Sequence, residues 1–381
     1  MKVVVIGAGA AGLGIAWKLV RAGAEVTVLE RAQVGNGATS ASAGMIAAAA
    51  EIGEADTPEA AFARRGSALW PSFARELQEQ SGVDIAFRSN GSLLVTMKGE
   101  EVASHPSGER HGEGGCIEVL RAEQTRAREP MLSQNISGAL WAPQEASVDS
   151  QALCRALAVA FVRAGGKVLS NETAVRFERD AKRVLGVVTP FATHHADTYV
   201  LAAGAWSSRL EGLPPEAVPP VIPVKGEVIV LAPPEGLAPP ATVIWGNGIY
   251  LTPRGDRLLV GATVERAGFD TSVTQQALVW LRSRSNGLMP ALENWRVAAH
   301  WAGLRPGSPD GLPILGQSAL ENLIVASGQY RNGILFAPAI AELIARLVLE
   351  QTGGEPAFDP RRFEGIGEDG ALTISETPHK A

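Results

Sequence analysis

The chain has 381 residues, of which 46% are hydrophobic and 19% are charged, and its formal net charge is −6. This length and composition are typical of a globular protein of one or two domains. The net negative charge provides no positive field for a polyanion, so we expect no nucleic acid partner. The two cysteines, Cys116 and Cys154, are too few for a disulfide framework and favour a reducing, cytoplasmic location.

The N-terminal part predicts neither a targeting segment nor a membrane anchor. The first strand begins at Lys2 or Val3, which leaves no room for a targeting sequence. The apolar stretch 41–50 is too short to span a bilayer, so no membrane association is expected.

The first thirty residues predict a nucleotide-binding unit. A strand, a helix and a second strand are expected over residues 3–6, 10–22 and 26–30. Between strand and helix, Gly7 allows a tight turn, Gly9 lets the backbone approach a pyrophosphate, and Gly12 lets the helix pack closely. Free N–H groups at the helix N-terminus would bind the phosphates, and Glu30 would accept hydrogen bonds from a ribose. The motif predicts a dinucleotide site without separating FAD from NAD.

The rest of the chain alternates helical and strand patterns. Helices are expected over residues 58–80, 150–164, 274–287 and 337–351. Strands are expected over residues 91–97, 167–170, 184–189, 198–203, 224–231, 249–252, 257–264 and 323–327. Residues 33–42 and the polar, glycine-rich residues 99–115 are expected to be loops. Helical segments separated by strand-rich stretches predict an α/β fold with a sheet-rich insertion.

Further motifs follow the opening glycines in order along nearly the whole chain. They are Thr39–Met45, Leu201–Trp206, Pro223–Glu227, Tyr250–Arg254, Leu259–Thr263, Trp301–Pro306 and Tyr330–Leu335. On these motifs the chain resembles the D-amino-acid-oxidase-like flavoproteins, and among them the glycine oxidase branch of the thiamine pathway. The resemblance implies non-covalent FAD and oxidative deamination of glycine or small D-amino acids to a 2-oxo acid, ammonia and hydrogen peroxide. In sarcosine-oxidase relatives a cysteine tethers the flavin, but neither cysteine here lies in such a motif.

The resemblance also implies a two-domain architecture. A discontinuous, Rossmann-like FAD-binding domain would comprise residues 1–82, 145–215 and 300–365. A sheet-rich substrate-binding domain would comprise residues 83–144 and 216–299, and residues 366–381 would form a polar tail.

Three side chains are implied to bind the substrate. Arg305 would hold the substrate carboxylate, because a guanidinium offers paired donors in a planar fork. Tyr250 would add a hydroxyl donor, and Arg331 would lie near both substrate and flavin. Taken by themselves, the two arginines could equally be surface residues and Tyr250 a packed strand residue. No catalytic side chain is expected, because hydride transfer from Cα to flavin N5 needs no general base.

The resemblance places further residues along FAD. Those at the pyrophosphate and adenosine are Gly7, Gly9, Ala10, Ala11, Gly12, Glu30, Arg31 and Val175. Those along the ribityl chain and ring are Ala38, Thr39, Ala43, Gly44, Met45, Gln329, Tyr330, Asn332, Gly333, Ile334 and Leu335. Backbone N–H groups of Gly333 and Ile334 would stabilise negative charge on the reduced ring. The family often has a histidine where Gln329 stands.

Other functions stay open from the sequence. A D-amino-acid dehydrogenase would share the fold and the carboxylate clamp but pass electrons to a carrier other than dioxygen. A sarcosine or amine oxidase, or a non-catalytic flavin-binding subunit, is also compatible with the fold. The six histidines show no metal-ligand spacing, so no metal is expected, and His300 is expected to be a packed residue. The resemblance implies a homo-oligomer.

Overall fold

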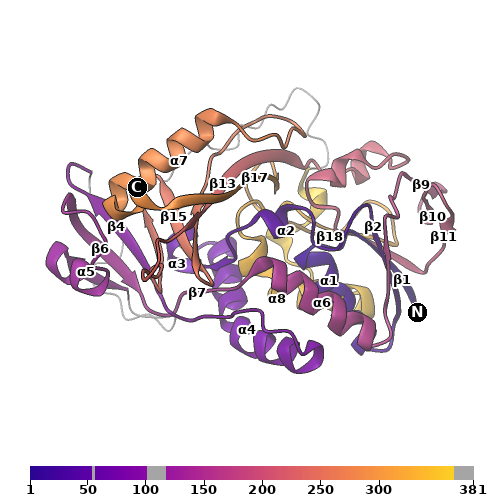
Figure 1. Ribbon diagram of the computed structural model, residues 1–381. Coiled ribbons are helices and arrows are strands. Elements are labelled where there is room, and N and C mark those ends of the chain that lie inside the picture. The colour runs from indigo at the N-terminus through magenta and orange to yellow at the C-terminus, as the bar shows by residue number, and fades with distance from the viewer. Residues whose placement is uncertain (54–55, 101–116, 364–381) are drawn as a thin grey trace.

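The computed structural model describes residues 1–53, 56–100 and 117–363. Two large sheets form its two halves (Figure 1), a mainly parallel sheet around β1 and β2 and a larger sheet around β4, β6 and β15. The expected loop 99–115 and the expected tail 366–381 lie almost entirely outside the described residues.

The six-stranded sheet is the nucleotide-binding core. Its order is β18 (Ile314–Gln317), β19 (Leu323–Ser327), β12 (Thr198–Leu201), β1 (Lys2–Ile6), β2 (Glu25–Glu30) and β8 (Lys167–Ser170). All neighbours are parallel except β18 and β19. Val3 and Val5 pack against helices on one face, while Val4 and Ile6 face a small sheet on the other. Because both faces are covered, the strands are apolar on both sides.

The layers on this sheet come from distant parts of the chain. The helices are α1 (Ala10–Arg21), α4 (Pro58–Ser81), α6 (Ser150–Arg163) and α8 (Gly333–Glu350). The small sheet comprises β9 (Arg176–Arg179), β10 (Val184–Val188) and β11 (Thr193–His194). No helix among the described residues is long and apolar enough to cross a membrane.

The eight-stranded sheet forms the other half. Its order is β17 (Arg296–Gly307), β13 (Ile222–Ala232), β16 (Arg257–Gly261), β15 (Ile249–Arg254), β14 (Val243–Gly246), β4 (Ser92–Met97), β6 (Ile136–Ala142) and β5 (Glu118–Arg121). Helix α7 (Gln275–Leu288) covers one face through Leu281 and Leu288. On the opposite face Val228 and Leu259 meet Ala43 of the nucleotide-binding half.

Short elements connect the two halves. They are α2 (Ala38–Ala41), β3 (Met45–Ile46), α3 (Ala48–Glu51), β7 (Ala146–Ser147) and the 3-10 helix η1 (Gly204–Arg209). Helix α5 (Ala122–Arg128) instead packs against β5 and β6 at the edge of the larger sheet. Strands β3 and β7 pair with each other, antiparallel. The short helix α2 corrects the expectation that residues 33–42 form only a loop.

The expected α/β architecture with a sheet-rich second half is confirmed, and the domain boundaries stay a prediction. Helix α8 begins at Gly333, earlier than the expected start at residue 337. It continues through Pro338 although proline lacks the N–H that would bond the carbonyl of Ile334. The indole N–H of Trp70 donates to that carbonyl at 3.1 Å and so replaces the missing donor.

Candidate active site

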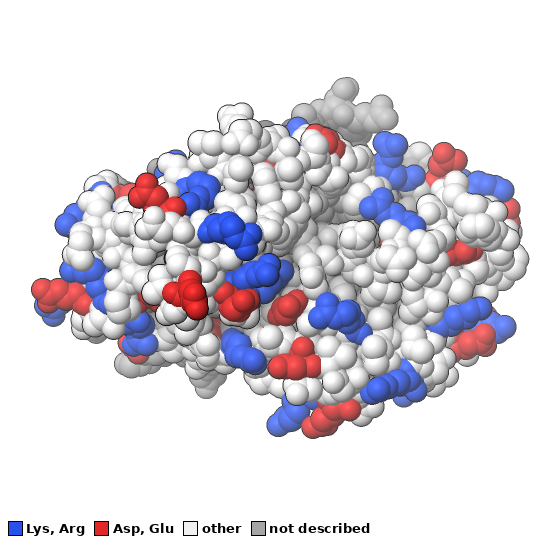
Figure 2. Space-filling model, in the orientation of Figure 1, with Lys and Arg blue, Asp and Glu red and all other residues white. Residues whose placement is uncertain are grey.

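A cavity of about 1930 Å³ lies between the two large sheets. Its wall includes the β1–α1 turn, residues of β13 to β17, and the segment that joins β19 to α8. Figure 2 shows charged side chains of both signs scattered over one face of the molecule, without a single large positive patch. The cavity is large enough for a dinucleotide together with a small second ligand.

The β1–α1 turn shapes one end of the cavity. Gly7 has φ +107°, and a Cβ there would overlap the carbonyl of Ala202, so this turn requires glycine. The carboxylate of Glu30 accepts hydrogen bonds from the N–H groups of Ala8 at 2.8 Å and Ala32 at 3.0 Å. These bonds hold Glu30 at the carboxyl end of β2, where a ribose would lie.

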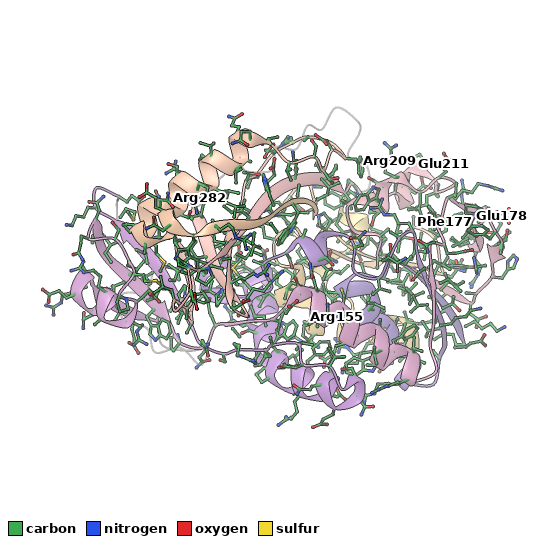
Figure 3. The ribbon with its side chains drawn as sticks, in the orientation of Figure 1. Arg155, Phe177, Glu178, Arg209, Glu211 and Arg282 are labelled. Carbon is green, nitrogen blue, oxygen red and sulfur yellow. The ribbon has the colours of Figure 1, made fainter. Side chains whose placement is uncertain are left out.

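The end of the cavity where the adenosine is expected is lined by Arg31, Arg209 and Trp206. The guanidinium carbon of Arg31 lies 3.4 Å from the ring centroid of Trp206, a residue of η1 that ends the Leu201–Trp206 motif but was not predicted to bind the cofactor. Arg209 and Glu211 follow and lie near Phe177 (Figure 3), whose N–H donates to the Glu211 carbonyl at 2.8 Å. Trp206 lines the cavity, and stacking on its ring would suit a purine base, whereas Phe177 is buried in the core and lies off the wall.

With one exception, the structure places the predicted cofactor residues on the cavity wall. Those on the wall are Gly7, Gly9, Ala10, Ala11, Glu30, Arg31, Ala38, Thr39, Ala43, Gly44, Met45, Val175, Gln329, Tyr330, Asn332, Gly333, Ile334 and Leu335. Gly12 is buried behind the turn, where a Cβ would overlap the Gly7 carbonyl. Gly12 therefore allows α1 to pack closely against the turn. The contacts of the other residues with FAD stay a prediction.

The segment before α8 fits a flavin ring. Gln329 Nε2 and Asn332 Oδ1 are buried and have no hydrogen-bond partner among the described residues. The first turn of α8 adds the backbone N–H groups of Gly333 and Ile334, which have no partner within the helix. A ligand with a polar edge, such as the isoalloxazine ring, would satisfy these groups.

Beyond the predicted ring site, Tyr250, Arg305 and Arg331 come together on the wall. Tyr250 comes from β15, Arg305 from β17, and Arg331 from the turn after β19. Arg305 Nη1 donates to the carbonyls of Lys225 at 3.3 Å and Thr263 at 3.2 Å. Within the described parts of the chain, no carboxylate forms an ion pair with Arg305.

The pKa shifts follow from this crowding. Burial lowers the pKa of the Arg305 guanidinium, and the nearby positive charge of Arg331 acts in the same direction. Burial also raises the pKa of the Tyr250 hydroxyl, which therefore remains a protonated donor at neutral pH. Burial lowers the pKa of Arg331, but the Glu51 carboxylate together with Tyr330 and Tyr250 raises it by more, so the pKa is raised overall. This concentration of donors and positive charge favours an anion such as a carboxylate.

Glu51 is a functional candidate that the sequence analysis missed. It ends α3, lines the cavity and acts electrostatically on all three predicted substrate residues. Ala47, Ala49 and Ala50 lie on the same wall, so this alanine-rich segment is a wall of small side chains. An isolated acid in an alanine-rich segment carries no motif, and only the tertiary fold brings it to the site.

Two other expectations concern residues away from the wall. His300 packs inside the sheet, where its Nε2 lies 2.8 Å from Oε2 of Glu227, and it does not line the cavity. Cys154 is buried, and burial raises the pKa of its thiol to about 12. Cys116 lies outside the described residues.

Comparisons with known proteins identify the family. The FAD dependent oxidoreductase family (DAO) matches residues 2–347. A glycine oxidase of Geobacillus kaustophilus is 34% identical, with 95% of each chain covered. The bifunctional protein ThiO/ThiG of a Nostoc species is 36% identical over 92% of this chain, which spans only 53% of that relative's length.

The solved structures agree with the sequence relatives. The crystal structure of glycine oxidase from Geobacillus kaustophilus superposes with a TM-score of 0.86 at 32% identity, and the match covers 94% of this chain and 97% of that one. The expected FAD-dependent fold and cofactor class are thereby confirmed. With a family match over nine-tenths of its length, the chain belongs to the FAD-dependent oxidoreductases of the D-amino-acid oxidase type.

Proposed function

We propose that this protein oxidatively deaminates glycine or a small D-amino acid, giving the 2-oxo acid, ammonia and hydrogen peroxide. The observation that carries the proposal is the position of Arg305. Its guanidinium lies deep in the cavity beside Tyr250 and forms no ion pair with a carboxylate of the described chain. A zwitterionic amino acid would supply that carboxylate.

The residues of the chain would then bind and orient the substrate. Arg305 and Tyr250 hold the carboxylate, while Glu51 offers negative charge to the ammonium group on the same wall. FAD, when bound, supplies the two-electron oxidation of the Cα–N bond. The small side chains of Ala49 and Ala50 leave room for a short substituent on Cα or nitrogen.

The relatives support the choice of substrate. Proteins named glycine oxidase match nearly the full length of this chain, and the ThiO/ThiG proteins suggest a place in thiamine biosynthesis. We extend the proposal to a cytoplasmic location, which the low cysteine content favours, and to a homo-oligomer. Size-exclusion chromatography with light scattering would measure the oligomeric state.

Oxygen consumption tests the proposed function. The purified, FAD-loaded protein is given glycine, sarcosine, D-alanine, D-proline and L-alanine in parallel, and hydrogen peroxide is measured as well. We expect oxygen uptake with glycine or D-amino acids and none with L-alanine. Bleaching of the flavin without oxygen, combined with no oxygen uptake in air, would instead indicate a dehydrogenase.

A further inference from the structure

Arg305 is oriented by backbone groups. Its Nη1 donates two hydrogen bonds, to the carbonyls of Lys225 and Thr263. A guanidinium Nη carries two hydrogens, so this nitrogen is fully used. The edge formed by Nη2 and Nε is therefore the one that can meet a carboxylate, and the positions of the two carbonyls decide where that edge points.

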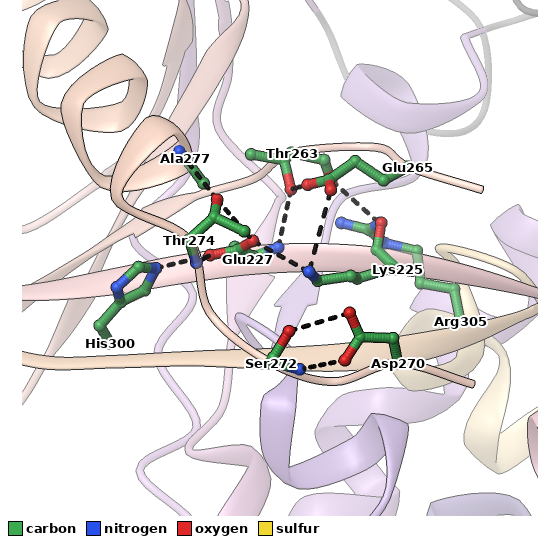
Figure 4. Close-up of polar contacts among 10 residues, drawn as sticks. All are labelled: Lys225, Glu227, Thr263, Glu265, Asp270, Ser272, Thr274, Ala277, His300 and Arg305. Atoms are coloured by element: carbon green, nitrogen blue, oxygen red, sulfur yellow. Dashed lines mark hydrogen bonds and ion pairs between the residues drawn. The ribbon is translucent and has the colours of Figure 1, made fainter. Parts of the chain in front are cut away.

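A buried polar cluster lies behind these carbonyls (Figure 4). Lys225 Nζ lies 3.1 Å from Glu227 Oε1, and the two side chains are 2% and 0% exposed. Glu227 also accepts hydrogen bonds from the backbone N–H and the hydroxyl of Thr274, the N-cap of α7, at 2.9 and 3.1 Å. Although burial would raise it, these bonds and Lys225 lower the pKa of Glu227. The carboxylate is thus charged and held from several sides.

Register separates this cluster from the substrate side of the sheet. Successive residues of a strand face opposite sides, and residues directly opposite on paired strands face the same side. On β13, Gly226 pairs with Gly303 and Val224 pairs with Arg305, so these residues share the cavity side. Lys225 and Glu227 therefore face the other side. Their side chains can therefore influence Arg305, the proposed carboxylate clamp, only through the backbone and not by direct contact.

Thr263 connects the cluster to the clamp. Its hydroxyl accepts a hydrogen bond from the Glu227 N–H at 2.9 Å and donates to Glu265 Oε1 at 2.6 Å. Lys225 and Glu265 also exchange backbone hydrogen bonds at 2.9 and 3.0 Å. The two carbonyls that accept hydrogen bonds from Arg305 belong to Lys225 and Thr263. The hydrogen bonds of this network hold both of these residues in place.

A buried ion pair is a poor source of stability, because the loss of solvation offsets its attraction. We propose that Thr263, Lys225, Glu227 and Glu265 form a positioning network that sets the orientation of the Arg305 guanidinium toward the substrate carboxylate. None of the four side chains needs to touch the reacting atoms. This inference rests on the proposed function only in naming Arg305 as the carboxylate clamp.

The test removes the Thr263 hydroxyl while keeping its shape. Thr263→Val loses the two hydrogen bonds of the hydroxyl, and since these act on Arg305 only indirectly, we expect the KM for glycine to rise roughly fivefold, with kcat within about twofold of the wild type. The Kd for acetate, a carboxylate without an amine, should rise by the same factor when followed by flavin absorbance. Thr263→Ser keeps the hydroxyl and should restore both values.

Thr252→Val is the matched control. Thr252 is a 1% exposed threonine of β15 whose hydroxyl has no partner among the described residues. This variant should leave the KM for glycine and the Kd for acetate unchanged. A Thr263→Val variant that matches Thr252→Val, or that loses kcat with KM unchanged, would overturn the proposal.

A second variant guards against misfolding of the first. The Glu265 side chain is 39% exposed, so Glu265→Gln should fold normally and weaken acetate binding in the same direction by a smaller factor. Unchanged acetate binding in Glu265→Gln would count against the network. If the wild type binds acetate but does not oxidise glycine, the proposed function fails while acetate binding by the variants still tests the network. If the wild type does not bind acetate, the network proposal is wrong.

Discussion

Gly226 lies against the guanidinium of Arg305, and a Cβ on Gly226 would lie 2.6 Å from Arg305 Cζ. Strands β13 and β17 pair closely here, and only the absence of a side chain at Gly226 leaves room for Arg305 to lie flat beside the neighbouring strand. Sterics thus explain why the Lys225-Gly226-Glu227 motif has glycine at its centre, and the sequence alone does not reveal this.

We therefore expect Gly226→Ala to displace Arg305 and raise the KM for glycine at least tenfold, or about 1.4 kcal/mol of substrate binding. Steady-state kinetics measure the effect, with Gly14→Ala as the control. Gly14 is buried in α1, where a Cβ would lie 3.4 Å from the nearest atom, an ordinary contact. An unchanged KM in Gly226→Ala would show that Arg305 does not hold the substrate.

The nucleotide site could be predicted from the sequence because its information is local. The turn at Gly7 and the acid Glu30 lie within one βαβ unit, and the required backbone geometry selects their residue types directly. The substrate site is different, because Tyr250, Arg305 and Arg331 come from separate segments. Only the resemblance to a family could bring these three together before the fold was known.

Two other features could not be predicted from the sequence, and the cause in each case is physical. Residues 296–307 form the long strand β17, but their many small residues hide the alternation that marks a strand. Glu51 reaches the site because Glu145 binds the backbone of α3, a contact between residues almost a hundred positions apart. Such long-range pairing leaves no periodic signal in either segment.

Two substitutions separate the contributions of Arg305 and Tyr250 to binding of the substrate carboxylate. Arg305→Ala should raise the KM for glycine by about two orders of magnitude or more, since a buried charged partner is removed. Tyr250→Phe removes one hydroxyl donor to a charged group and should raise the KM roughly tenfold while kcat changes less. Steady-state kinetics with glycine measure both. A normal KM in Arg305→Ala would contradict the clamp assignment.

Glu145 predicts a pH dependence of stability. Its carboxyl is buried, accepts a hydrogen bond from the Ala50 N–H at 2.8 Å and bonds to the Ser92 hydroxyl. Burial raises its pKa from 4.5 to about 7. Between these two values the folded chain holds a proton that the unfolded chain has released. Stability therefore falls as pH rises from about 4.5 to 7, by on the order of 3 kcal/mol, and this loss is complete above pH 7.

Glu145→Gln cannot ionise and should lose this part of the pH dependence. Thermal unfolding at pH 5 and pH 8 measures it, and the variant should show a smaller fall in Tm than the wild type. Glu118→Gln changes an exposed carboxylate of β5 and serves as the control. Parallel Tm profiles for the wild type and Glu145→Gln would mean that Glu145 does not titrate in this range.

FAD retention tests the other end of the cavity. Both carboxylate oxygens of Glu30 already accept backbone hydrogen bonds, from Ala8 and Ala32, so the side chain is fixed before the cofactor arrives. Glu30→Gln keeps only one acceptor oxygen and should raise the Kd for FAD roughly tenfold. Fluorescence of released FAD measures this, and Glu25→Gln at the exposed start of β2 is the control. A fixed acceptor loses little entropy on binding a ribose, which is why its loss should weaken FAD binding. An unchanged Kd for FAD in Glu30→Gln would mean that the ribose does not bond to Glu30.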